Sequence, residues 1–397
     1  MFENIIGQES IVERLSTEVG AEILPPALLF HGPDYSGKCS TALELARALT
    51  CTGPDRGVPW ACPCRSCVGQ RHLLHPDTLL LGGRYFSREI AVAVSALKRD
   101  RRTALRYLLE RSVRKLSRRF DPILWEGDEQ RLKKVEPLLA ELDEVLAPYL
   151  PGNELPDDRS YARGLDSIAA VCGKIVAAQP LDAVPVHLIR RLGHWSHLAP
   201  AGPAKIAIVE NIDRLLESAR NALLKTLEEP PQGVYFVLTT RRRGAVIPTI
   251  LSRARAYGFA TRGAEQSAAV IDRIFRDSPG AHPSIRDYFI SVDGRGLRPL
   301  AERFFESCLT GDDIELGLLD EIDRTIASLG AGEGFRYFVE ELSDLMRLVL
   351  RSDTGVAPRV IGAWRSELGR AAVRVEAYNI ATSRALEGLY YHMRGAG

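Results

Sequence analysis

Two glycines and a lysine near the start of the chain have the types and spacing of a phosphate-binding loop. Gly32, Gly37 and Lys38 fit the pattern G-x4-G-K. An apolar strand is expected before them, at residues 27–30, and a helix after them, at about residues 40–48. In this context the backbone N–H groups of the loop surround phosphate oxygens at the positive end of the helix, and the lysine reaches the terminal phosphates. These residues indicate a nucleotide loop.

The residue after the lysine departs from that pattern. Cys39 stands where Ser or Thr supplies a hydroxyl to Mg²⁺, and a thiol is a poor ligand for this hard cation. Ser40 and Thr41 are close in sequence, but one residue on a helix is a rotation of about 100°, so neither is an obvious substitute. Two interpretations stay open: a loop that binds ATP with Mg²⁺, and an inherited loop that binds weakly or not at all.

Four clustered cysteines form a second group capable of chemistry. They are Cys51, Cys62, Cys64 and Cys67. Four thiolates close together suit a tetrahedral, structural Zn²⁺ with no open position. The chain has seven cysteines, and with the start MFENIIGQES, which is not a secretory signal, they fit a reduced cytoplasm and a metal site better than disulfides.

A parallel sheet is needed to position these residues. Residues 205–209 and 234–238 are apolar, β-branched runs typical of buried strands, and apolar residues at helical spacing lie between them. Pro230 and Pro231 end that helix. A strand, a helix and a second strand make a βαβ unit, so the fold class is α/β with a parallel sheet.

Composition sets further limits. The 397 residues predict two to three domains, and the formal net charge of +1 creates no global attraction to nucleic acid or to a membrane. Any contact with DNA must therefore come from local patches. No apolar run approaches 18 residues, so no membrane span is expected, and the predicted location is the cytoplasm.

Two motifs carry a family resemblance. NALLKTLEEPP at Asn221–Pro231, followed by PTILSR at Pro248–Arg253, resembles the clamp-loader subunits of bacterial DNA polymerase III, the δ′ and γ/τ proteins. These are AAA+ proteins. The resemblance covers residues 1–82 and 183–260 well and the C-terminal part more loosely. It implies an AAA+ base domain with a zinc module and a helical insertion, a helical lid and an all-α collar.

Domain boundaries follow from that resemblance. The expected parts are a base domain at residues 1–83 and 181–260 with its zinc module at about 51–67, an insertion at 84–180, a lid at 261–311 and a collar at 312–397.

The family also implies roles at the strand ends. An active member ends one strand with an Asp that holds Mg²⁺ indirectly, followed by a Glu that polarises the attacking water. Here Glu210 and Asn211 take those two positions, and an amide accepts no proton. Thr239 or Thr240 matches a position that senses the γ-phosphate, with strand-end capping as the alternative. Arg298 is near the position of a second sensor arginine.

One arginine has an implied role outside this chain's own site. Ser252-Arg253-Ala254 resembles the Ser-Arg-Cys motif of the family, with Ala254 in place of Cys. In the assembled ring the arginine reaches ATP held by a neighbouring subunit, where a guanidinium stabilises charge on the transferring phosphoryl group. The alternative is a surface arginine near a subunit contact.

The family also carries a four-cysteine zinc module at this place in the chain, usually with two residues between successive members of the last three cysteines. Here only Pro63 separates Cys62 from Cys64, which puts the fourth ligand in question. His72 or His75 could replace one thiolate, although a structural role is the preferred interpretation of His75. Four unliganded thiols are the remaining alternative.

The insertion is the main departure from the family pattern. Residues 84–119 hold 12 Lys/Arg against 3 Asp/Glu, and residues 120–160 hold 4 against 11. We expect a helical hairpin with one basic and one acidic arm that neutralise each other. A basic arm that binds DNA or an acidic partner is the alternative.

These observations predict a δ′-like clamp-loader subunit within a DNA polymerase III complex, with its own ATPase absent. Its role would be to support a hetero-oligomeric ring and to donate Arg253 while the ring loads the sliding clamp on primed DNA. Its partners would be the γ/τ and δ subunits, the clamp and primer–template DNA, with no membrane. The alternatives are an active γ/τ-type ATPase and a stand-alone DNA-binding module acting through the basic part of the insertion.

Overall fold

The computed structural model describes residues 1–397 apart from 55–58, 85, 180–183, 281, 294–296, 312, 330, 352–356, 379 and 395–397. The chain divides into two compact units, Met1–Asp293 and Gly294–Gly397. Across the described residues, no helix has both the length and the apolar character needed to cross a membrane.

The N-terminal unit is built on a five-stranded sheet in the order β2-β3-β4-β1-β5, and every pairing is parallel. The strands are β1 (Ala27–His31), β2 (Thr78–Gly82), β3 (Lys205–Glu210), β4 (Val234–Thr240) and β5 (Arg255–Gly258). The α/β class and the parallel sheet predicted from the sequence are confirmed. Because all carboxyl ends lie at one edge, the loop after β1 and the end of β3 flank the end of β4.

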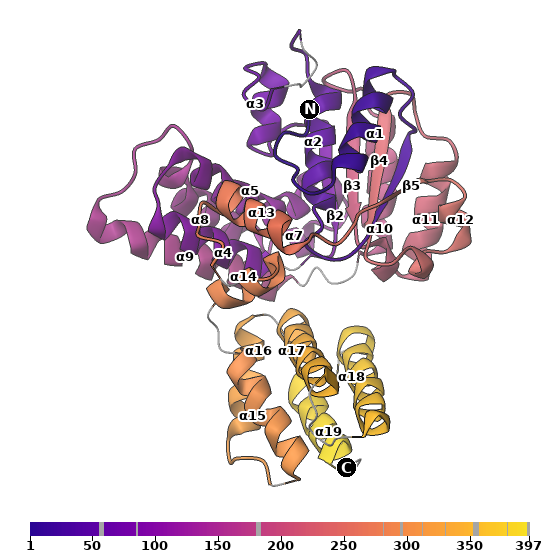
Figure 1. Cartoon of the computed structure of the whole chain (residues 1–397). Helices are drawn as coiled ribbons and strands as arrows, with labels where there is room; N and C mark the ends of the chain where they lie inside the picture. The colour runs from indigo at the N-terminus through magenta and orange to yellow at the C-terminus, as the bar shows by residue number, and fades with distance from the viewer. Residues whose placement is uncertain are drawn as a thin grey trace. The chain divides into compact units, whose positions relative to one another are not determined.

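Helices cover both faces of this sheet (Figure 1). The helices of the N-terminal unit outside the insertion are α1 (Glu9–Gly20), α2 (Lys38–Thr50), α3 (Arg65–Arg71), α10 (Val186–His197), α11 (Glu217–Glu228), α12 (Pro248–Leu251), α13 (Ala264–Phe275) and α14 (Ile285–Asp293), with the 3₁₀ turns η3 (Ile212–Arg214) and η4 (Arg243–Ala245). Leu28 and Phe30 of β1 pack with α1 and α2, whereas Leu29 packs in a second core on the opposite face. Burial on both faces explains why β1 to β4 contain continuous apolar runs, whereas β5 at the edge of the sheet does not.

The insertion extends that second core and does not form a body of its own. Its elements are α4 (Phe86–Arg99), α5 (Thr103–Ser117), η1 (Arg118–Phe120), α6 (Pro122–Trp125), α7 (Glu129–Leu132), α8 (Glu136–Leu146), η2 (Ala147–Tyr149) and α9 (Asp158–Ala178). Ile90, Leu109 and Leu165 belong to the same buried cluster as Leu79 and Leu81 of β2. The insertion is helical, as expected, but it is not a two-armed hairpin, because prolines begin α6 and lie in the first turns of α8 and η2.

The C-terminal unit is all helical. Its helices are α15 (Leu297–Thr310), α16 (Leu318–Ser328), α17 (Ala331–Arg351), α18 (Pro358–Tyr378) and α19 (Thr382–Arg394). The boundary between the compact units lies inside the expected lid range, because α13 and α14 belong to the first unit and α15 to the second. The reason is packing: Phe304 of α15 is buried and makes edge contacts with Phe338 and Tyr390.

Candidate functional site

The phosphate-loop residues lie where the sequence predicts them, between β1 and α2. Gly37 has φ +97° and precedes α2, a backbone conformation that favours glycine. The Lys38 Nζ donates to the carbonyl oxygens of Gly32 and Pro33, each at 2.6 Å. Burial lowers the pKa of Lys38 despite nearby carboxylates. The ammonium group is therefore hydrogen-bonded to the loop itself.

The Cys39 thiol belongs to the apolar core and not to a metal site. Cys39 is 7% exposed and packs in the cluster that contains Leu28 and Phe30. Burial, with the Glu210 charge adding to it, raises the pKa of this thiol. The hydroxyl of Thr41 is also engaged, because it donates to the Gly37 carbonyl at 3.0 Å. Neither side chain presents an oxygen suited to Mg²⁺ at this helix start.

Sequence reasoning missed an arginine that lies against the phosphate loop. The Arg262 guanidinium donates to the carbonyl oxygens of Ile6, at 2.8 Å, and Tyr35. Its Nη2 would be 2.6 Å from a Cβ built on Gly37. The Tyr35 ring also contacts Phe289 of α14, with ring centroids 5.2 Å apart. Arg262 and Ile6 are 256 residues apart in the chain, so no local pattern reveals the contact.

The carboxylate at the end of β3 is held by arginines of the insertion. Glu210 is 4% exposed, and its Oε1 accepts from Arg84 Nη1 at 2.7 Å while its Oε2 accepts from Arg119. Arg84 also pairs with Glu89 at 2.7 Å, and Lys115 pairs with the same Glu89. Burial by itself would raise the pKa of Glu210, but the charges of Arg84 and Arg119 outweigh it and lower the pKa. Glu210 is therefore an ionised member of a buried ion cluster.

The neighbouring polar side chains bind the strand ends to one another. Asn211, in the left-handed region at φ +53°, donates from Nδ2 to the Gly83 carbonyl at 2.6 Å. Its backbone N–H donates to the Thr239 hydroxyl at 3.1 Å, and the Thr240 hydroxyl donates to Asp213 at 2.8 Å. The structure thus gives both threonines the strand-end capping that the sequence left as an alternative.

The two arginines assigned by resemblance lie elsewhere. Arg253 follows α12, is about a third exposed, and pairs with Glu228 at 2.7 Å. It also donates to the Thr249 carbonyl at 2.9 Å. Arg298 lies in the C-terminal unit, where it pairs with Glu302 at 2.7 Å and Glu341 at 3.2 Å. The edge of the sheet therefore brings together the predicted residues of the loop and of β3 and β4, and a second unit contains Arg298.

The four predicted cysteines come together. One donor sulfur from each of Cys51, Cys62, Cys64 and Cys67 lies within 4.8 Å of the other three. The Cys51 sulfur is 3.8 Å from those of Cys62 and Cys64. Sulfur atoms bound tetrahedrally at about 2.3 Å from Zn²⁺ lie about 3.8 Å apart, so the spacing fits a metal. It is far longer than the roughly 2.05 Å of a disulfide.

Hydrogen-bond donors point at the sulfurs of the cluster, although burial raises the pKa of Cys51 and of Cys67. N–H groups of Gly53 and Cys67 donate to the sulfurs of Cys51 and Cys64 at 3.3 and 3.4 Å, and Arg47 Nη1 lies 3.8 Å from the Cys67 sulfur. Burial raises the pKa of the Cys64 thiol, but N–H groups directed at it outweigh this and lower the pKa to about 6. The single residue Pro63 does not prevent Cys64 from joining the cluster.

Neither nearby histidine belongs to the cluster. His72 pairs through Nδ1 with the buried carboxylate of Glu110 at 2.8 Å. His75 Nε2 lies 3.1 Å from the Ser66 hydroxyl, and its Nδ1 accepts from the Asp77 N–H at 3.1 Å. The structural interpretation of His75 is confirmed, because both of its nitrogens have partners.

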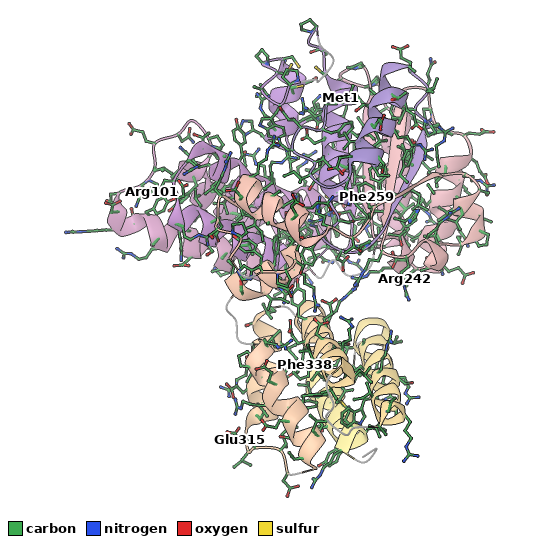
Figure 2. All side chains as sticks on the ribbon, in the orientation of Figure 1. Met1, Arg101, Arg242, Phe259, Glu315 and Phe338 are labelled. Carbon is green, nitrogen blue, oxygen red and sulfur yellow. The ribbon has the colours of Figure 1, made fainter. Side chains whose placement is uncertain are left out.

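The expected mutual neutralisation of the two arms of the insertion holds only in part. Arg101, at the outer end of the insertion (Figure 2), pairs with Asp158 at 2.7 Å. Arg119 instead pairs with Glu210 of the base. Arg106 donates to the carbonyl oxygens of residues 148, 149, 150 and 153. Neither these backbone carbonyl partners of Arg106 nor the distant carboxylate partner of Arg119 was predictable from the adjacent charge runs.

Comparisons with known proteins agree with this architecture. The family model described as "DNA polymerase III, delta subunit" matches residues 7–104 and 173–262. DNA polymerase III subunit delta′ of Yersinia pestis is 40% identical over 74 residues, which are 18% of this chain and 22% of that protein. DNA polymerase III subunit tau of Escherichia coli K12 is 36% identical over 85 residues, which are 21% of this chain and 13% of that protein.

These matches span less than a quarter of the curated relatives' own length. Among solved structures, a DNA polymerase III gamma subunit-related protein from Thermotoga maritima aligns at 17% identity and a TM-score of 0.34, over 59% of this chain and 90% of that one. A likeness at that score supports no conclusion about this chain. The family model, which covers a little under half of the chain, and the sequence relatives make this chain similar to the clamp-loader subunits of DNA polymerase III.

Proposed function

We propose that this chain is a δ′-like clamp-loader subunit that hydrolyses no ATP itself and donates Arg253 to ATP bound by a neighbouring subunit. Its partners would be the γ/τ and δ subunits, the sliding clamp and primer–template DNA in a hetero-oligomeric ring. It would act within a DNA polymerase III complex in the cytoplasm, where the thiols of the cysteine cluster stay reduced.

The observation that carries the proposal is the chemistry at the two hydrolytic positions. The Cys39 thiol is buried in the apolar core, and the Asn211 amide donates to the Gly83 carbonyl at 2.6 Å. Hydrolysis requires a hydroxyl on Mg²⁺ and a base that orients the attacking water. These side chains supply neither, so Mg²⁺-ATP does not fit this edge as a reacting group.

The position of Arg253 is compatible with action on a neighbour. Its carboxylate partner, Glu228, is itself about half exposed, so the pair is a surface ion pair that contributes little to stability. Exchanging this partner for a phosphate of another subunit would therefore cost little. A guanidinium supplied across a subunit boundary is a recognised way to stabilise the charge of phosphoryl transfer.

The cysteine cluster is proposed as a structural Zn²⁺ site. Cys51, Cys62, Cys64 and Cys67 would hold the ion, and their four sulfurs would leave no position for a catalytic water. The metal would join the end of α2, where Cys51 lies, to the start of α3, where Cys64 lies.

The test is the ATPase rate of a reconstituted loader with clamp and primed DNA. We expect no hydrolysis by the isolated chain, and a loss of about 10-fold or more in the complex on Arg253→Ala. Arg163→Ala, at an exposed position of α9, serves as the matched control and should leave the rate unchanged. Hydrolysis by the isolated chain that is indifferent to Arg253 would replace this proposal with an active γ/τ-type ATPase.

The stand-alone DNA-binding alternative receives less support. Arg119, Arg106 and Arg111 of the basic segment are engaged with protein carboxylates or carbonyls. A salt series decides the matter, because a DNA-binding arm gives an affinity that falls steeply with salt in the absence of partners.

A further inference from the structure

The insertion contacts the carboxyl edge of the sheet, beside the phosphate loop, at both ends of the helical pair α4–α5. Arg84 lies just before α4 and Arg119 follows α5, yet the two guanidinium groups bind the two oxygens of the same carboxylate, Glu210. Lys115 of α5 pairs with Glu89 of α4, and Arg84 pairs with the same Glu89. The ion cluster therefore closes the α4–α5 pair onto the end of β3.

These charges occupy the place where the family implies a divalent cation. Both Glu210 oxygens accept from arginine, and Arg84, Arg119 and Lys115 bring three positive charges against the two negative charges of Glu210 and Glu89. A Mg²⁺ ion at Glu210 would need to displace an arginine and stand beside the others. Coulomb repulsion in a buried site opposes that strongly.

Burial makes the arrangement hard to open. Arg119 is 3% exposed and Glu210 is 4% exposed. The Arg119 guanidinium also lies 5.7 Å from the centre of the Phe86 ring. Separating the pair would leave an uncompensated charge inside the protein, which is far more costly than losing an exposed pair.

The same helices hold the two helices that follow the base domain. Val92 of α4 lies in one buried cluster with Ile271 of α13 and Phe289 of α14, and Figure 1 shows α13 and α14 against the insertion. Arg99 of α4 pairs with Asp277 at 2.7 Å and donates to the Tyr288 hydroxyl at 3.1 Å. These helices lie in the range 261–311 that the resemblance assigns to the lid.

The phosphate loop is held from the same side. Phe289 of α14 contacts the Tyr35 ring in the loop, and Arg262 binds the Tyr35 carbonyl and lies against Gly37. Both the loop and the end of β3 are thus linked to α14, the loop directly through Phe289 and the end of β3 through the insertion.

We propose that the insertion is an internal clamp, which holds the carboxyl edge of the sheet in one conformation. Arg84 and Arg119 take the place of a divalent cation at Glu210, and α4 holds α13 and α14 in one position. This deepens the proposed function, since it explains how a subunit without hydrolysis keeps one rigid shape. It stands or falls separately from the donation of Arg253, because its test uses the full chain without partners.

The test compares hydrogen exchange of the full chain with and without Mg²⁺ and ATP. We expect the exchange of residues 86–117 and 264–292 to be unchanged by Mg²⁺-ATP in the wild type. Glu210→Gln should accelerate exchange in both segments by about 10-fold or more and lower the apparent unfolding midpoint by about 6 °C or more. Arg102→Met, which removes a pair with Asp100 at the far end of α4, should do neither.

A double-substitution cycle separates a clamp from general destabilisation. Arg119→Met alone should also accelerate exchange. The double variant Glu210→Gln with Arg119→Met should lose less stability than the two single variants added together, because no charge of this pair is then left buried without its partner. Protection of residues 264–292 by Mg²⁺-ATP in the wild type would overturn the proposal without any variant. So would a Glu210→Gln protein that behaves like Arg102→Met.

Discussion

Removing one sulfur from the cysteine cluster should abolish tight metal binding. Cys64→Ser is the informative change, because Cys64 is separated from Cys62 by Pro63 alone and yet its sulfur lies 3.8 Å from that of Cys51. That separation equals the roughly 3.8 Å expected between sulfurs about 2.3 Å from one Zn²⁺. The sulfurs therefore lie at the spacing that one bound zinc ion would require.

The expected magnitude follows from ligand count and mass action. Loss of an outer partner of a metal ligand costs about 10–100-fold in affinity, so loss of a direct thiolate should cost more. With free zinc about 1,000-fold above the dissociation constant, binding stabilises the fold by about 4 kcal/mol. At roughly 2 °C per kcal/mol for a unit of this size, chelation should lower the unfolding midpoint by about 8 °C.

The assay is zinc content per chain in freshly purified, reduced protein, with affinity from chelator competition and the midpoint with and without chelator. We expect one zinc per chain for the wild type and for the control His72→Gln, since His72 pairs with Glu110 outside the cluster. Wild-type protein without metal, or Cys64→Ser with wild-type affinity, would refute the four-sulfur site.

Two further predictions concern the carboxyl edge of the sheet near Glu210. Gly82→Ala should lower the free energy of unfolding by more than about 3 kcal/mol or prevent folding, because φ is +99° and the new Cβ would lie 2.1 Å from the Glu210 carbonyl oxygen. The control is Gly152→Ala, at φ +96° with no atom within 4 Å of the new Cβ. It should lower the free energy of unfolding by only about 1 kcal/mol, as measured by urea unfolding. Burial would raise the pKa of Glu89, but Arg84 and Lys115 hold it at about 2. Its stabilisation, up to about 3 kcal/mol, is present above the unfolded pKa of about 4.3 and is lost as the pH falls toward 2. Glu89→Gln should therefore be less stable at pH 7 and lose less between pH 5 and 3, and equal pH slopes for the two proteins would contradict this.

Local patterns in the sequence determined the scaffold of the site. Two apolar β-branched runs joined by a stretch with helical spacing predict parallel strands connected by a helix. The pattern G-x4-G-K predicts a glycine loop at the start of a helix. The gathering of Cys51, Cys62, Cys64 and Cys67 is similarly local, because all four lie close together in the sequence. Cys39 and Asn211 departed from the family pattern by residue type alone, which needs no structure.

Only the tertiary structure decided which charges meet. Arg84 and Arg119 are 126 and 91 residues from Glu210, and opposite charges close to them in sequence suggested other partners. Ion-pair partners depend on which faces dock, and docking is set by the shared apolar core that unites the insertion with β2. The same reason hid Arg262 and the contact of α14 with the phosphate loop: long-range packing leaves no periodic signal in the chain.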